Sequence, residues 1–192
     1  MNGQRAKIAF IGTHGVGKTT LCFELAARLK RRDVNVEMVR EVARRCPLPI
    51  NRDTTYDAQS WILHTQIARE LASAGRHEIV ICDRSVLDNY AYLVNKIGRR
   101  REMDPLIVHW LTTYNALIKV PIWKAPSFDG VRDVGLEFQR EIDHTLETLI
   151  ADFGAATLRL EPDAMKAWTA QVLAYLQLPA RAEQVPLFPE DA

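Results

Sequence analysis

The alternation of apolar and polar positions along the chain predicts five short strands separated by amphipathic helices. Short apolar runs that are typical of buried strands occur at residues 8–11, 34–39, 78–82, 118–123 and 156–160. Pro121 interrupts the pairing of the fourth run and weakens that assignment. Apolar residues recur at helical spacing after residue 18 and over 54–75, 86–96, 104–117, 142–153 and 164–176. Strands that alternate with helices in this way predict an α/β fold with a parallel sheet covered on both faces.

The helix expected over residues 54–75 carries a stripe of apolar and small residues. At helical spacing this stripe predicts a buried face made of Trp61, Ile62, Thr65, Ala68, Leu71 and Ala72. The other faces are then expected to carry the polar residues Gln59, His64, Gln66 and Arg69.

A glycine-rich turn joins the first expected strand to the first helix. Gly12, Gly17, Lys18 and Thr19 fill the spacing G-x-x-x-x-G-K-[ST] of a P-loop, or Walker A motif. The glycines allow backbone N–H groups to curl around an anion, and Lys18 can then reach the β- and γ-phosphates of ATP. The hydroxyl of Thr19 is placed to bind Mg²⁺. The residues predicted to bind the nucleotide are Gly12, His14, Gly15, Val16, Gly17, Lys18, Thr19 and Thr20.

Charged residues follow the second and third expected strands, where each strand ends. Glu41, Arg44 and Arg45 follow the second strand, and Asp83 and Arg84 follow the third. In open parallel sheets, ligands bind beyond the carboxyl ends of the strands, so these side chains are expected to face the nucleotide. Asp83 can hold Mg²⁺ directly or through water, together with Thr19.

The length of the chain favours a single α/β domain, and its charge is nearly balanced. The 192 residues suit a single domain over 1–178, followed by a loose C-terminal tail over 179–192. Lys and Arg total 25 against 24 Asp and Glu, so the net charge of +1 gives no general argument for nucleic acid or a membrane. Three cysteines without metal-like spacing and no apolar run of roughly 18 residues favour the cytoplasm, with Cys22 and Cys82 packed in the core.

Three motifs, taken in their order, resemble the P-loop nucleoside and nucleotide kinases. They are Gly-Thr-His-Gly-Val-Gly-Lys-Thr-Thr at 12–20, Asp-Arg-Ser at 83–85, and Asp-Gly-Val-Arg…Arg at 129–140. The stretch 82–92 is similar to the Glu-Arg-Ser stretch of deoxynucleoside kinases and the Asp-Arg stretch of thymidylate kinases. Glu-Val-Ala-Arg at 41–44 is similar to ribosylnicotinamide kinase domains and their AAA-type relatives. The resemblance covers residues 6–178 through sparse motifs.

The resemblance implies a role for each matching residue. Glu41 stands where deoxynucleoside kinases carry the carboxylate that accepts the proton of the acceptor hydroxyl, and Asp83 is the second candidate for this base. Arg84 is then expected near the transferring phosphoryl group. Arg132 and Arg140 are expected in a lid segment over residues 125–140 that closes over the nucleotide. The residues expected to contact the acceptor are Arg44, Arg45, Gln59 and Tyr92. For an acceptor that carries its own phosphate, the run Arg99–Arg101 could provide further arginines.

The implied function is an ATP- and Mg²⁺-dependent kinase whose acceptor is a hydroxyl or phosphate of a nucleoside, nucleotide or similar small metabolite. Related kinases are often homodimers, and the oligomeric state of this chain stays open. One alternative is a polynucleotide 5′-hydroxyl kinase that uses Arg99–Arg101 as backbone contacts, which the balanced charge disfavours. Another is a regulatory P-loop ATPase or GTPase without an acceptor. A GTP switch reads guanine through Asn-Lys-x-Asp, whereas Asn95-Lys96-Ile97 is followed here by Gly98.

Overall fold

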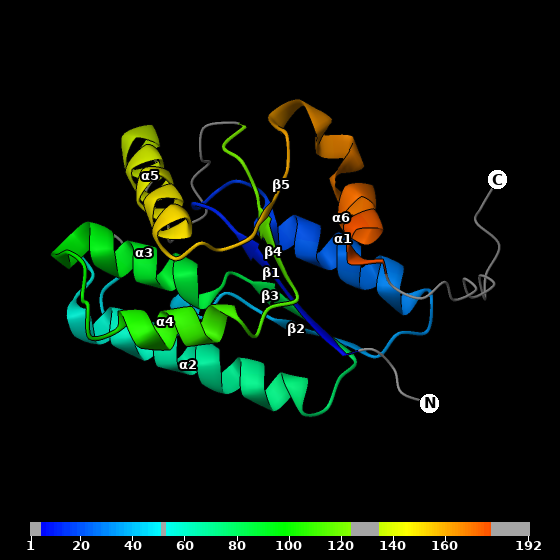
Figure 1. Cartoon of the computed structure of the whole chain (residues 1–192), viewed down its shortest axis with the longest axis horizontal. Coiled ribbons are helices and arrows are strands. Elements are labelled where there is room, and N and C mark those ends of the chain that lie inside the picture. The colour runs from blue at the N-terminus through cyan, green and yellow to red at the C-terminus, as the bar shows by residue number, and fades with distance from the viewer. Residues whose placement is uncertain (1–4, 51–52, 124–134, 178–192) are drawn as a thin grey trace.

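The computed structural model describes residues 5–50, 53–123 and 135–177, and a five-stranded parallel sheet forms its centre (Figure 1). The strand order is β2-β3-β1-β4-β5, so β1 lies between β3 and β4. The strands are β1 (Ala6–Ile11), β2 (Val36–Val39), β3 (Ile79–Asp83), β4 (Ala116–Lys119) and β5 (Leu158–Arg159). The helices are α1 (Lys18–Lys30), α2 (Tyr56–Ala74), α3 (Val86–Ile97), α4 (Asp104–Leu111), α5 (Leu136–Asp152) and α6 (Trp168–Leu176), with short 3₁₀ helices η1 (Ala43–Arg45) and η3 (Pro162–Ala167).

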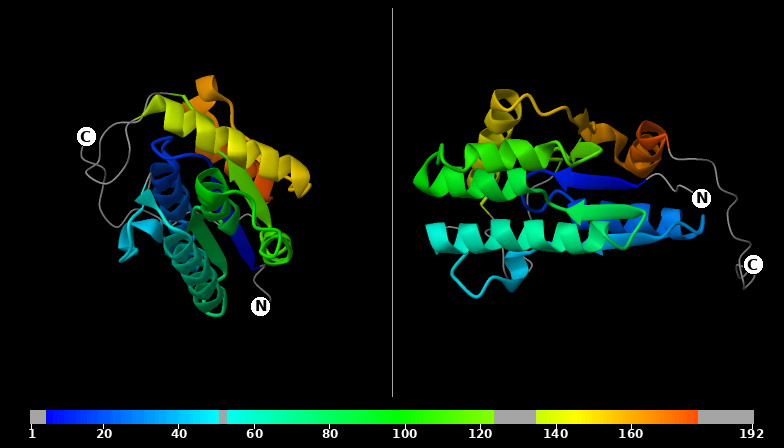
Figure 2. Two further views of the ribbon diagram at one scale, coloured as in Figure 1. Left: turned by 90° about the vertical axis from the view of Figure 1, so that its left-hand side faces the viewer. Right: turned by 60° about the horizontal axis from the view of Figure 1, so that its bottom comes forward.

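The sheet separates two hydrophobic cores, because successive side chains of a strand point to opposite faces. Ile8 and Phe10 of β1 pack on the face covered by α1 and α6. Ala9 and Ile11 pack on the face covered by α2, α3, α4 and α5. Figures 1 and 2 show these two layers of helices on either side of the strands. The predicted parallel sheet with helices on both faces is therefore confirmed.

The later strands are shorter than the apolar runs predicted. β4 covers Ala116–Lys119 rather than 118–123, so Leu117 belongs to the strand and not to the preceding helix. Pro121 lies beyond the end of β4, as expected for a residue without a backbone N–H to donate. β5 has only two residues, Leu158 and Arg159.

The buried face of α2 differs from the one predicted. Leu71 is 61% exposed, and Ala68 and Ala72 are also exposed. The buried residues of α2 are Ala58, Gln59, Ile62, Leu63, Gln66 and Glu70. Because Gln66 and Glu70 are hydrogen-bonded in the interior, two polar residues occupy the face that the apolar pattern assigned to others.

Two cysteines support the interior of the fold, as predicted. Cys22 and Cys82 are both fully buried, on opposite faces of the sheet. Burial raises the pKa of both thiols well above its usual range, so they remain protonated and pack as small apolar groups. Within the described residues, no helix has the length and apolar character needed to cross a membrane.

Candidate active site

The glycine-rich loop leaves β1 and enters α1 in a conformation that requires glycine. Gly12 has φ +145°, and a Cβ there would lie 2.7 Å from the carbonyl oxygen of Val120. Gly17, directly before α1, has φ +93°. The first turn of α1 contains no acidic residue, so its N–H groups and helix dipole stay available to an anion. The backbone is therefore shaped to hold phosphate groups.

Lys18 and the loop itself are held by several hydrogen bonds. The buried Lys18 Nζ donates to the carbonyl oxygens of Gly12, at 2.8 Å, and of Thr13. Asp88 Oδ1 accepts from the backbone N–H of Gly12 at 2.9 Å. The other oxygen of Asp88 accepts from the N–H and hydroxyl of Ser85, so one carboxylate caps α3 and fixes the loop.

Two further side chains, one on α5 and one in the segment after β4, also hold the loop. Gln139 of α5 is fully buried and donates from Nε2 to the carbonyl oxygen of His14 at 2.8 Å. Trp123 donates from Nε1 to the carbonyl oxygen of Val16 at 2.9 Å. Both bonds use backbone carbonyl oxygens of the loop and occupy none of its N–H groups.

Thr19 and Asp83 lie together at the start of α1 and the end of β3. The hydroxyl of Thr19 donates to Asp83 Oδ2 at 2.6 Å. Hydroxyl and carboxylate oxygens are the hard ligands that Mg²⁺ prefers, and Mg²⁺ usually takes only one or two of them from the protein. The described residues contain no group of three or more His, Cys, Asp or Glu that could hold a metal ion by themselves. The pair therefore fits a Mg²⁺ site completed by phosphate oxygens and water.

Glu41 is buried and held by two arginines from different elements. Arg84 Nε donates to Glu41 Oε1 at 2.7 Å, and Arg44 Nε donates to Glu41 Oε2 at 2.9 Å. Only 6% of the Glu41 side chain is exposed, so these charge-assisted bonds lie in a largely water-excluded site. Both carboxylate oxygens thus accept a hydrogen bond from a guanidinium.

Arg84 is a buried cation in a strained backbone conformation. Its φ is +92°, a region that costs a non-glycine residue about 1–3 kcal/mol. Burial acts to lower the pKa of its guanidinium, but Tyr92, Glu41, Asp88 and Asp83 outweigh that effect and raise the pKa well above its usual value. Among the described residues Nη1 has no hydrogen-bond partner, although it lies 3.9 Å from Asp88 Oδ1. Nη1 is therefore a buried donor that none of the described residues satisfies, on a residue that lines the side cavity.

Two pockets meet at Glu41 and Arg44. The larger, of about 460 Å³, is lined by the loop from Gly15 to Thr20 and by Phe23, Arg40, Glu41, Arg44, Arg45 and Asp83. The smaller, of about 30 Å³, has room for a water molecule. Its lining consists of His14, Glu41, Ala43, Arg44, Ile50, Gln59, Ile62, Arg84, Asn89 and Tyr92. We call them the phosphate pocket and the side cavity.

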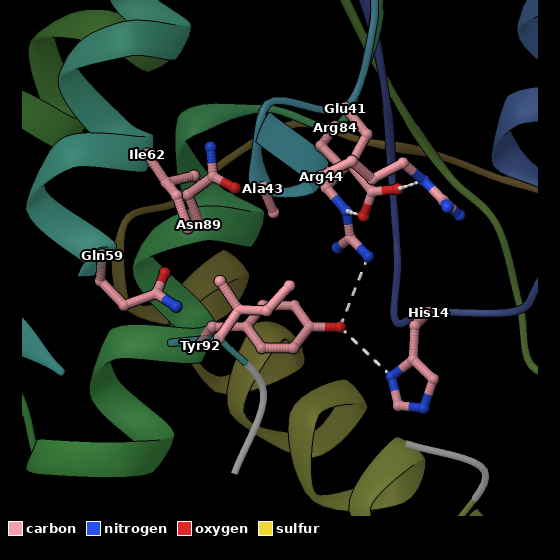
Figure 3. Close-up of a pocket in the computed structure, with 10 residues that line it drawn as sticks. His14, Glu41, Ala43, Arg44, Gln59, Ile62, Arg84, Asn89 and Tyr92 are labelled. Atoms are coloured by element: carbon pink, nitrogen blue, oxygen red, sulfur yellow. Dashed lines mark hydrogen bonds and ion pairs between the residues drawn. The ribbon is translucent and has the colours of Figure 1, made fainter. Parts of the chain in front are cut away.

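Figure 3 shows how α2 and α3 face the charged residues across the side cavity. Gln59 and Ile62 project from α2, and Asn89 and Tyr92 project from α3. The Tyr92 hydroxyl accepts from Arg84 Nη2 at 3.5 Å and lies 3.2 Å from His14 Nδ1, so it connects the cavity to the loop.

The structure brings most of the predicted site residues together. The phosphate pocket is lined by Gly15, Val16, Gly17, Lys18, Thr19 and Thr20 of the loop, together with Glu41, Asp83, Arg44 and Arg45. His14 lines the side cavity instead, and the N–H of Gly12 is bonded to Asp88. Arg84, Gln59 and Tyr92 line the side cavity. Arg140 is exposed on α5, and its neighbour Gln139 makes the contact with the loop. Arg132 and most of the predicted lid segment lie outside the described residues.

Several residues around the site were missed in the sequence. No functional role was predicted from the sequence for four residues that lie at the site: Asp88, Asn89, Trp123 and Gln139. The Ser85-Val86-Leu87-Asp88 spacing does indicate a capping box, which predicts the start of α3 but not the second bond of Asp88 to Gly12. The other bonds join segments that are distant in sequence, and no local pattern announces them.

The basic run Arg99–Arg101 has contacts within the domain. Arg99 Nε donates to Asp104 Oδ2 at 2.9 Å, and Arg99 Nη1 also pairs with Asp152. The Arg100 guanidinium lies 5.8 Å from the ring centroid of Tyr56. These contacts give the run a structural role at the junction of α3, α4 and α5.

Comparison with known proteins agrees with this architecture. A family model described as an AAA domain matches residues 7–167. The deoxyadenosine kinase from M. mycoides with bound dATP has a TM-score of 0.64 at 16% identity, over 90% of this chain and 99% of that chain. A thymidylate kinase from Ehrlichia chaffeensis has a TM-score of 0.66 at 18% identity, over 91% of this chain and 100% of that chain. This likeness confirms the predicted P-loop α/β fold. No curated protein matches the chain.

Proposed function

The chain belongs to the AAA domain family, and on this premise we propose that it is a kinase that transfers the γ-phosphate of ATP to a nucleoside, nucleotide or similar small metabolite. The observation that carries the proposal is that Glu41 and Arg44 line both the phosphate pocket and the side cavity. A buried carboxylate between a phosphate site and a second cavity is what transfer to a second substrate requires. The names of the two structurally similar kinases support this choice of acceptor class.

The phosphate pocket supplies the groups that bind the donor. The loop amides and Lys18 hold the phosphates of ATP, because they surround the pocket with N–H groups and one positive charge. Thr19 and Asp83 hold Mg²⁺, whose chemistry when bound is to neutralise negative charge on the β- and γ-phosphates.

Glu41 and Arg84 act between the two substrates. Glu41 orients the acceptor hydroxyl and takes its proton, since it is the carboxylate shared by both pockets. Arg84 Nη1 donates to the transferring phosphoryl group, where negative charge lies in the transition state. Phosphoryl transfer depends mainly on such positioning and charge stabilisation.

The side cavity supplies the acceptor site. Ala43, Ile50 and Ile62 give it an apolar wall, while the amides of Gln59 and Asn89 can read polar groups on a ring. Asn89 Nδ2 is buried without a hydrogen-bond partner among the described residues. Because the cavity holds about 30 Å³, the side chains around it have to move apart before a nucleoside enters.

Transfer of labelled γ-phosphate from ATP to a panel of acceptors tests this function. With Mg²⁺ present, we expect label on a small molecule among nucleosides, ribosylnicotinamide and nucleoside monophosphates, because the cavity is small and partly apolar. A 5′-hydroxyl oligonucleotide and a lane without acceptor are included. Label found only as free phosphate, whatever the acceptor, would identify a regulatory ATPase instead.

Substitution of Thr19 or Asp83 is expected to raise the Mg²⁺ concentration that phosphoryl transfer requires. We expect Asp83→Asn and Thr19→Val to raise the half-saturating Mg²⁺ concentration by roughly 10-fold or more, because the first removes the negative charge of the carboxylate and the second removes the hydroxyl. Thr19→Ser keeps the hydroxyl and is the matched control, with a requirement close to that of the unaltered protein. Identical Mg²⁺ titrations for all variants would contradict this site.

A further inference from the structure

Glu70 of α2 is a fully buried carboxylate, and Gln66 connects it to the turn that carries Arg84. The two oxygens of Glu70 accept four hydrogen bonds at 2.7 or 2.8 Å, from Lys7 Nζ, Gln66 Nε2, Trp110 Nε1 and the Tyr114 hydroxyl. Lys7 Nζ also lies 4.5 Å from the Trp110 ring centroid and 4.4 Å from that of Tyr114. All four hydrogen bonds of this polar cluster end on the fully buried Glu70 in the interior, where such bonds are strong, while Gln66 Oε1 is buried without a hydrogen-bond partner among the described residues.

This cluster holds the backbone on both sides of Arg84. Gln66 Nε2 donates to the carbonyl oxygen of Arg84 at 3.2 Å as well as to Glu70. The Tyr114 hydroxyl accepts from the backbone N–H of Val86 at 3.2 Å while it donates to Glu70. The N–H of Arg84 itself donates to the carbonyl oxygen of Phe10 in β1. Three segments thus fix this turn: α2, the connection between α4 and β4, and β1.

Such support is needed because Arg84 has φ +92°. A residue other than glycine keeps this conformation only where its surroundings impose it. The conformation directs the side chain toward Glu41, to which Nε donates at 2.7 Å (Figure 3). If the turn relaxed, the guanidinium would leave its place between Glu41 and Tyr92.

We propose that Gln66, Glu70 and Tyr114 are positioning residues that hold Arg84 in its place beside Glu41. None of the three is among the residues that line the phosphate pocket or the side cavity. They therefore act on phosphoryl transfer through Arg84 and not by contact with a substrate. The catalytic part of this inference rests on the kinase function proposed above. The geometric part does not, because it concerns only the position of Arg84.

The two tyrosines of the chain that bridge a backbone N–H and a carboxylate offer a matched pair of variants. Tyr114 joins Val86 N–H to Glu70, and Tyr90 joins Arg100 N–H to Asp104 at 3.1 and 2.6 Å. Tyr114→Phe therefore removes the same kind of bridge as Tyr90→Phe, but only the first is connected to the turn. Gln66→Leu removes the second connection and keeps a side chain of similar size.

The position of Arg84 can be read from the NMR signal of its Nε–H group in arginine labelled with nitrogen-15. The signal is assigned from its loss in Arg84→Lys, and the signal of Arg44 from its loss in Arg44→Lys. We expect the Arg84 signal to shift or vanish in Gln66→Leu and Tyr114→Phe, and to remain in Tyr90→Phe. The signal of Arg44 is expected to remain in Gln66→Leu, because η1 carries that residue.

Steady-state kinetics with the acceptor found in the transfer panel give the second measurement. For Gln66→Leu and Tyr114→Phe we expect kcat to fall about 10-fold with both KM values within about twofold, since misplacement of a transition-state group costs rate more than binding. Tyr90→Phe should keep the kcat of the unaltered protein. A purely structural role would lower the melting temperature of all three variants and leave kcat alone.

The outcomes separate this inference from the proposed function. An unchanged Arg84 signal in both Gln66→Leu and Tyr114→Phe would overturn the inference, as would an equal change in Tyr90→Phe. A selective change of the signal in a protein that phosphorylates no acceptor would uphold the positioning of Arg84 and refute the kinase function.

Discussion

Glu41→Gln is expected to lower kcat by about 10²–10⁴-fold and to leave ATP affinity within about threefold. The amide keeps the shape of the side chain but cannot take a proton from the acceptor. It can still accept a hydrogen bond from one of the two arginines, Arg84 or Arg44. Binding of ATP depends on the loop and Lys18 and is therefore expected to persist. Kinetics at saturating acceptor, together with nucleotide binding by calorimetry, measure the two effects.

A conservative variant and the melting temperature provide the controls. Glu41→Asp keeps the charge but shortens the side chain, so we expect a smaller loss of kcat than in Glu41→Gln. Loss of activity only in proportion to lost folded protein would mean that Glu41 merely pairs with the buried Arg84. A turnover near that of the unaltered protein would contradict Glu41 as the base and favour Asp83.

Lys18→Ala is expected to reduce kcat/KM for ATP by about 10³-fold or more, because it removes the buried cation of the phosphate pocket. In the structure Lys18 Nζ bonds two carbonyl oxygens of its own loop, so its loss also leaves those acceptors unpaired. Transfer assays and binding of a fluorescent ATP analogue measure the effect.

Lys30 is the matched control for Lys18, because it is exposed and lies in the last turn of the same helix. Lys30→Ala should leave transfer unchanged. If Lys18→Ala retained the transfer rate and the ATP affinity of the unaltered protein, the assignment of this loop as the donor site would be wrong.

The order and type of the main elements could be predicted because they depend on local periodicity. The P-loop spacing, the apolar runs and the helical stripes all lie within one segment of chain each. The buried face of α2 was predicted wrongly for the same reason. Gln66 and Glu70 are polar, and only the partners Lys7, Trp110 and Tyr114, from distant segments, make their burial favourable.

The positions of those site residues that lie at the ends of strands could be predicted. Asp83 ends a parallel strand, and Glu41 and Arg84 follow parallel strands, which brings them to the same edge of the sheet as the loop. The side chains that hold the loop could not be found in this way. Gln139 and Asp88 reach it from α5 and α3, and their bonds depend on how those helices pack.

The small volume of the side cavity is expected to limit the hydrolysis of ATP by water when no acceptor is bound. In this structure, where the cavity has room for about one water molecule, both oxygens of Glu41 accept hydrogen bonds from arginines. A water molecule that enters the cavity therefore competes with two guanidinium groups for the base that would activate it. We expect an acceptor that separates the surrounding side chains to free Glu41 from the two guanidinium groups, and a water molecule to do so less effectively, so unproductive hydrolysis is expected to be slow. The lane without acceptor in the transfer assay measures this directly, and rapid release of phosphate there would refute it.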